Sequence, residues 1–409
     1  MKSLSERDQK HLWHPLTQHK LHPKMLGIVK AKGAVLFDEH GKEYIDAISS
    51  WYTSVYGHCN DAIIAKVYAQ MQQLDQVVFS GFTHEPAIAL SEALISLLPE
   101  NQEKLFFSDN GSTATEIGIK MALQYHHNLG KKRSVLMAFE DGFHGDTFGA
   151  MSVSGLSVYN GPFEDYFIEV KRIPVPTDAN LEGLLHELEN TMDLDAVAGF
   201  IYEPLVQGAA AMKMHKAEHL EKILKVIKSH GKTGRHFASD YMTEKPDIIC
   251  MSKALTAGML PMAVTSCTQN VYDAFYSDDI AKGLFHGHTY TANPLACAAA
   301  LAGIELLKSE GIQKNIGQII QWHQEFDAQI KDHPKVAATR QTGIIYALDL
   351  NIVMERYGNV RDKLFQHFMD AGVFLRPLGN TIYISAPYII TKDQMQRIYD
   401  SIRDVLEKF

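Results

Sequence analysis

Apolar and polar positions along the chain follow two periods, which together predict strands alternating with helices. Short apolar runs indicate buried strands, and apolar positions recurring every three or four residues indicate amphipathic helices. The expected strands are 104–107, 134–139, 196–202 and 247–251, and the expected helices are 62–74, 86–98, 113–129 and 219–230. This alternation favours an α/β fold with a mostly parallel sheet covered on both faces.

Both ends of the chain depart from that alternation. Residues 35–44 predict a β-hairpin, because apolar runs flank the polar turn at 38–41. After a helical region from 294 to 330, short apolar strands at 344–350, 373–376 and 381–385 are interleaved with helices near 361–371 and 392–406. The composition of the C-terminal part therefore predicts a separate α+β lobe beside the α/β region.

Composition and charge narrow the functional classes. A chain of 409 residues, 46% of them hydrophobic, can bury a large core. The net charge of −9 argues against nucleic acid or an anionic membrane surface as the main partner. The sequence has neither a secretory leader nor an apolar run of about 18 residues. Its four cysteines lack disulfide or zinc spacing. We expect a cytoplasmic protein that binds small molecules and no metal.

The stretch CMSKALTAG places Lys253 at the end of an apolar run. Such a lysine is usually a solvated surface charge. In a partly desolvated pocket, however, a lysine can lose its proton, attack a carbonyl and form a Schiff base. If the carbonyl belongs to pyridoxal phosphate, the chain should also supply a phosphate cradle, partners for the ring and an anchor for the substrate.

Two turns that follow strands are suited to the cofactor. The turn at 109–111 precedes a helix expected to open with a capping box from Thr113 to Glu116. Gly111 and Ser112 lie at this helix end, where backbone N–H groups favour a phosphate; a capped helix that binds nothing is the alternative. Phe143 and His144 would present a flat face and an imidazole to an aromatic ring, unless they form an ordinary turn with a packed aromatic.

Four further places carry candidate residues. Glu203 ends a strand, where its carboxylate would orient a donor or lie at the surface. Gly287, His288 and Thr289 precede a helix with Pro294 in its first turn, and would complete a phosphate site, including that of a neighbouring subunit.

The remaining two places concern the substrate. Arg376 follows an apolar strand, where a guanidinium clamps a carboxylate with two parallel hydrogen bonds or forms an ordinary ion pair. The aromatic loop at 48–58, with Trp51 and Tyr52, indicates either a pocket wall or core packing.

In their order, these motifs resemble the class III, fold-type I, pyridoxal-phosphate aminotransferases. The segments that match are HLWHPLT, SSWY, SGFTHEPA, DNGSTATE, GFHGDTFGAMS, EPLVQG, SKALTAG, HGHTYTANPLACAAA and LRPLGNTIYISAPY, which span nearly the whole chain. Within the family, WHP and GDTFGAMS resemble the enzymes that convert 8-amino-7-oxononanoate to 7,8-diaminononanoate in biotin biosynthesis. The resemblance thus implies that reaction, with S-adenosylmethionine or lysine as amino donor. It also implies a large α/β domain over 51–310 and a small α+β domain built from both chain ends, 1–50 and 311–409.

The resemblance also implies roles for single residues. Lys253 would bond to the cofactor and move the proton. The cofactor would be held by Gly111, Ser112, Phe143, His144 and Glu203, with His288 and Thr289 coming from the partner subunit of a homodimer whose active site is shared across the interface. The substrate would be bound by Trp51, Tyr52, Phe143, Gly287 and Arg376, with Arg376 taking its carboxylate.

Three departures from the family pattern change this expectation. Leu16 and Phe143 stand where well-known members have tyrosine, so two phenolic hydrogen bonds near the substrate are absent and the amino donor is open. In addition, Gly231 passes straight to Lys232. At this point the family has a strand whose aspartate bonds the pyridine nitrogen of the cofactor and keeps it protonated, which makes the ring an electron sink.

This third departure has two interpretations. Either the sequence skips a segment that the protein contains, or a central strand has been deleted. A strand with its connection needs about ten residues. If the deletion is real, the alternative function is a pyridoxal-phosphate-binding protein with impaired catalysis. A same-fold alternative, independent of the deletion, is another class III transaminase acting on an ω-amino acid.

Overall fold

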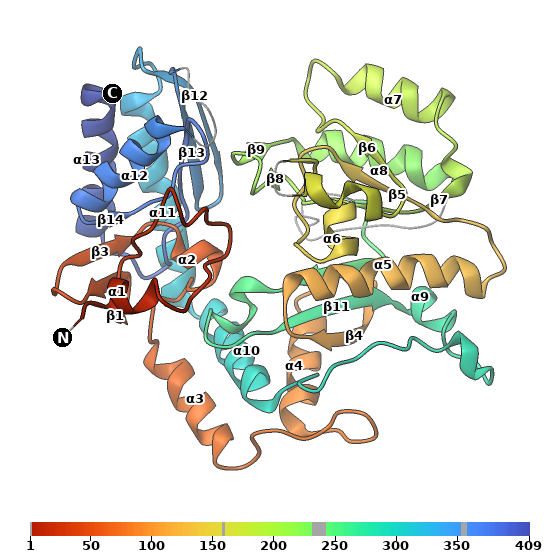
Figure 1. Ribbon diagram of the computed structural model, residues 1–409. Helices are drawn as coiled ribbons and strands as arrows, with labels where there is room; N and C mark the ends of the chain where they lie inside the picture. Colours follow the sequence, from red (N-terminus) through yellow and green to blue (C-terminus); the bar gives the residue numbers. More distant parts are fainter. Residues whose placement is uncertain (1, 158–159, 231–242, 353–357) are drawn as a thin grey trace. The chain divides into compact units, whose positions relative to one another are not determined.

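The computed structural model describes residues 2–157, 160–230, 243–352 and 358–409, which are drawn in colour in Figure 1. The chain separates into two compact units, one made of Met1–Ile64 with Leu306–Phe409 and the other of Ala65–Glu305. The domain boundaries expected at 50/51 and 310/311 stay predictions, while the units divide at 64/65 and 305/306.

The parallel sheet predicted for the second unit is present among its described strands. Its central strand β5 (Val135–Phe139) is buried along its whole length. Strands β6 (Val170–Ile173) and β7 (Val197–Ile201) pair with β5 in parallel on either side. Helices α7 (Leu181–Asn190) and α8 (Ala217–His230) share a hydrophobic core with this sheet, and Figure 1 shows both helices beside its strands. Strands followed by covering helices are what the alternating pattern predicts.

A second three-stranded sheet of this unit is antiparallel. Its central strand β11 (Ala263–Thr268) pairs with β4 (Gln102–Ser108) and with β10 (Ile248–Met251). All six residues of β11 are buried. The sequence did not predict this strand, because three of its residues are serine or threonine and the apolar run is short.

The two sheets lie along one helix, α5 (Gly111–Asn128), which contacts β7, β10 and β11. Among the described strands, β7 is bonded only to β5, and β10 only to β11. Strands β7 and β10 are therefore edge strands, each with one unpaired side in the described part of the chain. The other described α-helices and strands that lie wholly or mainly in this unit are α3 (Asp61–Met71), α4 (Glu85–Ile95), α6 (Phe148–Ser152), α9 (Gln269–Asp273), α10 (Pro294–Leu307), β8 (Val206–Gln207) and β9 (Lys213–Met214).

The first unit contains the predicted hairpin. Strands β2 (Val35–Asp38) and β3 (Glu43–Asp46) are antiparallel. They lie in a four-stranded sheet with β1 (Ile28–Lys32) and with β14 (Val373–Phe374), which runs parallel to β3. This pairing joins segments from the two ends of the chain, as expected for a domain that both ends build.

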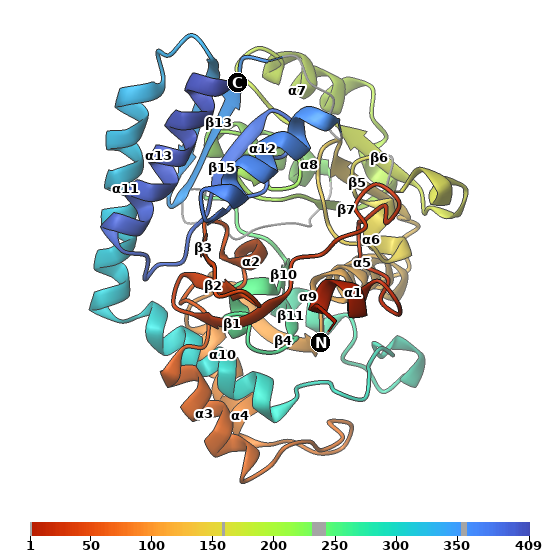
Figure 2. The ribbon, with the colours of Figure 1, turned by 60° about the vertical axis from the view of Figure 1, so that its left-hand side comes forward.

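A second sheet of the first unit is covered by two helices. It is antiparallel and consists of β12 (Val336–Thr342), β13 (Ile345–Leu350) and β15 (Thr381–Ile384). Figure 2 shows the covering helices α11 (Glu310–Ile330) and α13 (Lys392–Lys408) side by side. Their closest ring pair is Phe326 and Tyr399, which stack with centroids 4.1 Å apart. The remaining helices of this unit are α1 (Leu4–Asp8), α2 (Ser49–Tyr52) and α12 (Asn359–Asp370).

None of the helices in the described ranges has the length and apolar character needed to cross a membrane.

Candidate active site

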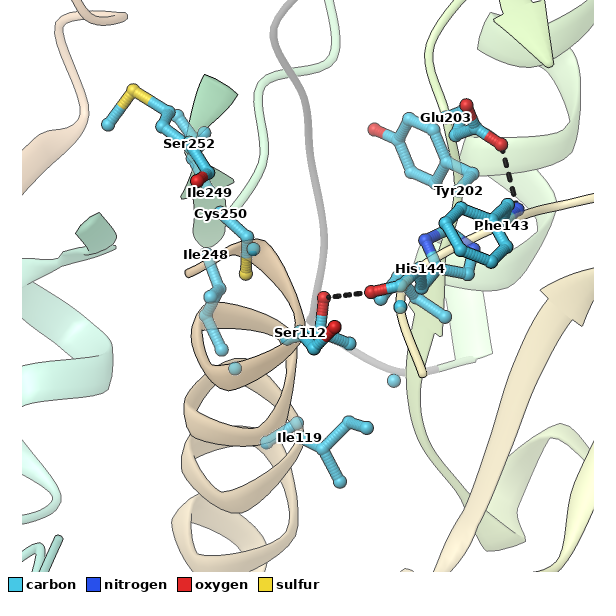
Figure 3. A pocket seen from close by; sticks show the side chains of 18 of the residues that line it. Ser112, Ile119, Phe143, His144, Tyr202, Glu203, Ile248, Ile249, Cys250 and Ser252 are labelled. Atoms are coloured by element: carbon cyan, nitrogen blue, oxygen red, sulfur yellow. Dashed lines mark hydrogen bonds between the residues drawn. The ribbon is translucent and has the colours of Figure 1, made fainter. Parts of the chain in front are cut away.

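A cavity of ≈ 490 Å³ lies in the second unit, bounded by α5, β7 and β10. Figure 3 shows the side chains that point into it from these elements and from the loops after β5 and β7. Six residues that the sequence predicted for the cofactor site line this one cavity: Gly111, Ser112, Phe143, His144, Glu203 and Lys253. Residues up to 142 positions apart in the sequence are therefore brought together.

The N-terminus of α5 forms one end of the cavity lining. The helix begins at Gly111, and the Asn110 side chain caps it by accepting a 2.9 Å hydrogen bond from the Thr113 N–H. The predicted capping box from Thr113 to Glu116 is wrong, because Glu116 instead accepts from the backbone N–H of Gly149 at 2.8 Å. Gly111 and Ser112 consequently lie in the first helical turn, where N–H groups have no partner within the helix and attract anions.

The loop after β5 is held tightly against that helix end. The N–H of Asp146 donates to Ser112 Oγ at 3.1 Å. Gly145 has a φ of +132°, and a β-carbon on it would lie 2.7 Å from Ser112 Cα. Only glycine meets both requirements, so Gly145 permits the close approach of the two backbones.

Phe143, His144 and Glu203 form the opposite side of the cavity. The Phe143 N–H donates to Glu203 Oε1 at 2.8 Å, and the Gly208 N–H donates to Glu203 Oε2 at 3.0 Å. Burial raises the pKa of Glu203, while these two bonds and the charge of Lys253 oppose that rise. Burial lowers the pKa of His144 to about 4, so its imidazole is neutral at pH 7. His144 Nε2 is buried and has no hydrogen-bond partner in the described chain.

Lys253 lies two residues after the end of β10 and lines the cavity from the start of a short 3₁₀ helix. Its backbone is left-handed, with a φ of 49°, which is strained for a residue other than glycine. The preceding Ser252 donates to the Met262 carbonyl at 2.9 Å and lies 3.5 Å from a β-carbon built on Gly111. The lysine is exposed in the described chain, whereas the sequence-based hypothesis placed it in a partly desolvated pocket.

Neither the predicted partner-subunit residues His288 and Thr289 nor the predicted substrate residue Gly287 lines this cavity. Gly287 and Thr289 are exposed, and the Thr289 carbonyl accepts a 2.7 Å hydrogen bond from Gln76 Nε2. His288 Nε2 is buried and has no partner among the described residues. Their loop also carries the exposed aromatic side chains of Phe285 and Tyr290.

The predicted substrate residues Trp51, Tyr52 and Arg376 belong to the first unit. The guanidinium carbon of Arg376 lies 5.1 Å from the centre of the Trp51 ring, within cation–π range. The Tyr52 ring lies 6.1 Å from that of Tyr383. Leu16, one of the two positions where the family has tyrosine, is 48% exposed.

Sequence reasoning missed the backbone that carries Trp51. Residues 49–52 all have φ between 46° and 67°, and none of them is glycine. A left-handed turn costs about 1–2 kcal/mol for each such residue. The sequence gives no indication of this turn, because residues 49–52 contain no glycine, the residue that usually marks positive φ.

The predicted break between Gly231 and Lys232 lies outside the described residues. Asp247 lines the cavity at the residue before β10. Asp247 cannot take the place of the family aspartate that bonds the pyridine nitrogen of the cofactor. The extended strand between Asp247 and Lys253 separates the two residues by roughly 15–20 Å. Within the described ranges, no group of three histidine, cysteine or acidic side chains is placed to hold a metal ion.

Comparison with known proteins agrees with this geometry. The class III aminotransferase family model matches residues 17–406. An adenosylmethionine-8-amino-7-oxononanoate aminotransferase of Synechococcus elongatus is 41% identical, with 97% of this chain and 99% of the relative covered. That alignment extends over 423 residues, more than the 409 of this chain, so the relative contains residues that have no counterpart here.

Two solved structures are similar over almost the full length. The enzyme of the same name from Methanocaldococcus jannaschii has a TM-score of 0.91 and 29% identity, with 99% of this chain and 98% of that chain covered. An amine transaminase from an uncultivated Pseudomonas species, solved with pyridoxal phosphate bound, has a TM-score of 0.90 and 25% identity over 98% of this chain and 99% of that one.

Proposed function

The chain belongs to the class III aminotransferase family, and from that membership we propose that it converts 8-amino-7-oxononanoate to 7,8-diaminononanoate in biotin biosynthesis. The class of chemistry rests on one observation: Lys253 shares a cavity with the helix N-terminus at Gly111 and Ser112. The choice of substrate rests on the name that the near full-length relatives carry.

The described residues fit pyridoxal phosphate. Gly111 and Ser112 would hold the phosphate, since first-turn N–H groups and the positive helix end favour a dianion. The Phe143 ring would lie against the cofactor ring, and His144 would bind it as a neutral imidazole, consistent with a pKa of about 4. Glu203, fixed by two backbone N–H donors, would orient a ring substituent. When bound, the cofactor supplies a carbonyl that captures amines and a ring that withdraws electrons.

The protein's own groups then bind substrates and move protons. Lys253 Nζ would anchor the cofactor and carry the proton between the carbon and nitrogen of the reacting amine. Arg376 would bind the substrate carboxylate with two parallel hydrogen bonds. Trp51, Tyr52, Phe143 and Gly287 would line the substrate pocket. The amino donor is S-adenosylmethionine or lysine in this proposal, because Leu16 and Phe143 lack the phenolic groups of well-known members.

A homodimer is part of the same proposal. His288 Nε2 is buried without a described partner, and exposed Phe285 and Tyr290 flank it. Exposed aromatic residues of this kind are common at subunit interfaces. His288 and Thr289 would bind the phosphate of the partner subunit's cofactor, so each active site would be shared. We also propose a cytoplasmic location.

A second candidate function is favoured by the free sheet edges. No described strand lies between β7 and β10, and the alignment with the Synechococcus elongatus relative is longer than this chain. A real deletion would remove the carboxylate that binds the pyridine nitrogen. The protein would then bind the cofactor through Lys253 and the phosphate site but catalyse poorly, because the ring would be a weaker electron sink.

The experiment that tests both candidates starts with purified protein and pyridoxal phosphate. Borohydride reduction followed by mass spectrometry of the intact and digested protein should give one pyridoxyl adduct on Lys253. Lys253→Arg keeps the charge and should abolish the adduct, whereas Lys213→Arg, at an exposed ion pair, should not. An adduct elsewhere would contradict the assignment of Lys253.

The same sample separates the functions by its substrates. With 8-amino-7-oxononanoate and either S-adenosylmethionine or lysine, the proposed enzyme should form 7,8-diaminononanoate. Formation of product only from ω-amino acids and pyruvate would support the other class III transaminase. A sample that forms the Lys253 adduct but transfers no amino group from any donor would support the impaired cofactor-binding protein.

A further inference from the structure

The left-handed turn at 49–52 is unfavourable by itself and requires stabilising contacts. Four consecutive non-glycine residues with positive φ are unfavourable. Strained backbones of this kind persist only where surrounding contacts fix them, and they concentrate at functional sites. The turn carries Trp51, a residue that is 40% exposed and whose ring centre lies 5.1 Å from the guanidinium carbon of Arg376.

Asp46 supplies contacts that fix the turn, in addition to the 2.7 Å hydrogen bond from Ser49 Oγ to the Ser385 carbonyl. Its side chain is fully buried at the end of β3. One carboxylate oxygen accepts a 3.2 Å bond from the Ile48 N–H. The other oxygen accepts a 2.8 Å bond from Ser50 Oγ and lies 2.8 Å from His58 Nε2. A buried carboxylate needs such donors, since each one offsets part of its desolvation.

The backbone of Asp46 also reaches the strand that leads to Arg376. Asp46 is paired with Phe374 across the parallel strands β3 and β14, and the Ala47 N–H donates to the Phe374 carbonyl at 3.0 Å. Arg376 follows Phe374 by two residues. Asp46 is therefore linked to Trp51 through its side chain and to Arg376 through the sheet.

We propose that Asp46, held by His58, is a positioning residue that fixes the left-handed 49–52 turn and so sets the Trp51 ring against the Arg376 guanidinium. It does not itself touch the substrate. The kinetic consequence rests on the proposed function, in which Trp51 and Arg376 bind the substrate. The structural consequence, a fixed indole ring, does not depend on that function.

Asp38 provides a matched control in the same sheet. It is also a buried aspartate at the end of a strand, and its carboxylate accepts from the N–H groups of His40 and Lys42 at 2.9 Å and from Tyr44 Oη at 3.0 Å. Asp38→Asn thus removes a buried charge with three donors, as Asp46→Asn does, without touching the turn at 49–52.

The first measurement is tryptophan fluorescence. Trp13→Phe and Trp322→Phe leave Trp51 as the one remaining tryptophan, since the sequence contains three. In this background, Asp46→Asn should raise the acrylamide quenching constant of Trp51 about two-fold, because a released ring is more accessible. Asp38→Asn should leave it unchanged. Equal quenching in Asp46→Asn and the parent, with a folded circular-dichroism spectrum, would overturn the proposal.

The second measurement is steady-state kinetics with 8-amino-7-oxononanoate. Asp46→Asn should raise KM about 10-fold while kcat and the cofactor absorption band stay near the parent's, because misplacement of a supporting residue weakens binding geometry. If the parent shows no activity with this substrate, the proposed function fails, and the fluorescence result still decides the proposal. If the parent is active and Asp46→Asn keeps its KM, the positioning role is wrong.

A milder variant covers the case in which Asp46→Asn does not fold. Ser50→Ala removes one of the three donors and keeps the carboxylate buried and bonded to His58. It should shift the quenching constant and KM in the same direction by a smaller factor. A Ser50→Ala protein identical to the parent in both readouts would contradict the proposal.

Discussion

Gly145 lies so close to Ser112 that a β-carbon on it would sit 2.7 Å from Ser112 Cα. This contact seats the loop after β5 on the N-terminus of α5, where the proposed phosphate site lies. The same loop carries Phe143 and His144. Gly145 therefore sets the distance between Ser112, at the proposed phosphate site, and the two residues proposed to contact the cofactor ring.

Gly145→Ala should therefore weaken cofactor binding. Alanine would have to adopt a φ of +132° and displace Ser112, at a cost of about 1–3 kcal/mol. We expect the Kd for pyridoxal phosphate to rise about 10- to 100-fold, measured by titration of the cofactor absorption band. Gly183→Ala is the control: it lies in α7 with no atom within 4 Å of the added carbon, and should leave the Kd unchanged.

Arg376→Lys should raise the KM for 8-amino-7-oxononanoate about 100-fold with a much smaller change in kcat. Lysine keeps the charge but loses the paired hydrogen bonds to a carboxylate, which are worth about 2–3 kcal/mol. The control is Arg403→Lys, since Arg403 also lies over an aromatic ring, 5.3 Å from the Phe326 centroid. A KM unchanged by Arg376→Lys would remove this residue from the substrate site.

The buried imidazole of His323 should lower the free energy of unfolding of the protein in acid. It is fully buried in the first unit, bonded to the Ile344 carbonyl at 3.1 Å and to Tyr399 Oη at 2.8 Å. Burial lowers its pKa to about 4, below the value of 6.5 expected in the unfolded chain. Between these values the unfolded state binds the proton first, so the free energy of unfolding should fall by about 3 kcal/mol as the pH drops from 6.5 to 4.

Urea unfolding at several pH values measures this effect. His323→Gln should show a smaller dependence on pH across that range. The dependence should not vanish, since the pKa of His144 is also lowered to about 4 by burial. His186→Gln, on the exposed side of α7, should keep the full dependence of the parent. An identical pH profile for His323→Gln and the parent would contradict the assignment.

Periodicity predicted the elements that bury one continuous apolar face. The strands expected at 134–139 and 196–202 and the helices expected at 113–129 and 219–230 are confirmed, because their apolar patterns are long and end at clear polar turns. Strand β6 and helix α7 of the same region were not predicted. Strand β11 was missed since Thr265, Ser266 and Thr268 are buried through hydrogen bonds rather than through apolar side chains; Thr265 Oγ1, for example, donates to the Ala114 carbonyl at 3.0 Å.

The candidate site was predictable to the level of residue types at strand ends. The sequence indicated Lys253, Gly111, Ser112, Phe143, His144 and Glu203, and the structure places them around one cavity. It did not indicate that Asn110 caps α5, because Asn110 and Thr113 are both good capping residues and the choice depends on where Glu116 bonds. The left-handed backbone at Lys253 and at 49–52 was also unpredictable, because none of these residues is glycine and the local sequence gives no other indication of positive φ.

The free edges of β7 and β10 predict fast hydrogen exchange. Strand β5 has a partner on both sides, whereas β7 and β10 each have one among the described strands. Backbone amides on an unpaired edge exchange without unfolding of the sheet, so peptides that cover 197–201 and 248–251 should exchange about 10-fold faster than those covering 135–139. Strand β11, which is paired on both sides, is the matched slow control for β10. Hydrogen-exchange mass spectrometry of the purified protein, with its intact mass measured in parallel, checks this expectation.

Slow exchange in all three segments would mean that a further strand covers both edges. An intact mass above 45.8 kDa would then identify that strand as chain beyond the 409 residues, and the impaired cofactor-binding protein would be ruled out. Fast exchange at a mass of 45.8 kDa would instead mean that the deletion is real, and would predict an adduct at Lys253 with little transamination.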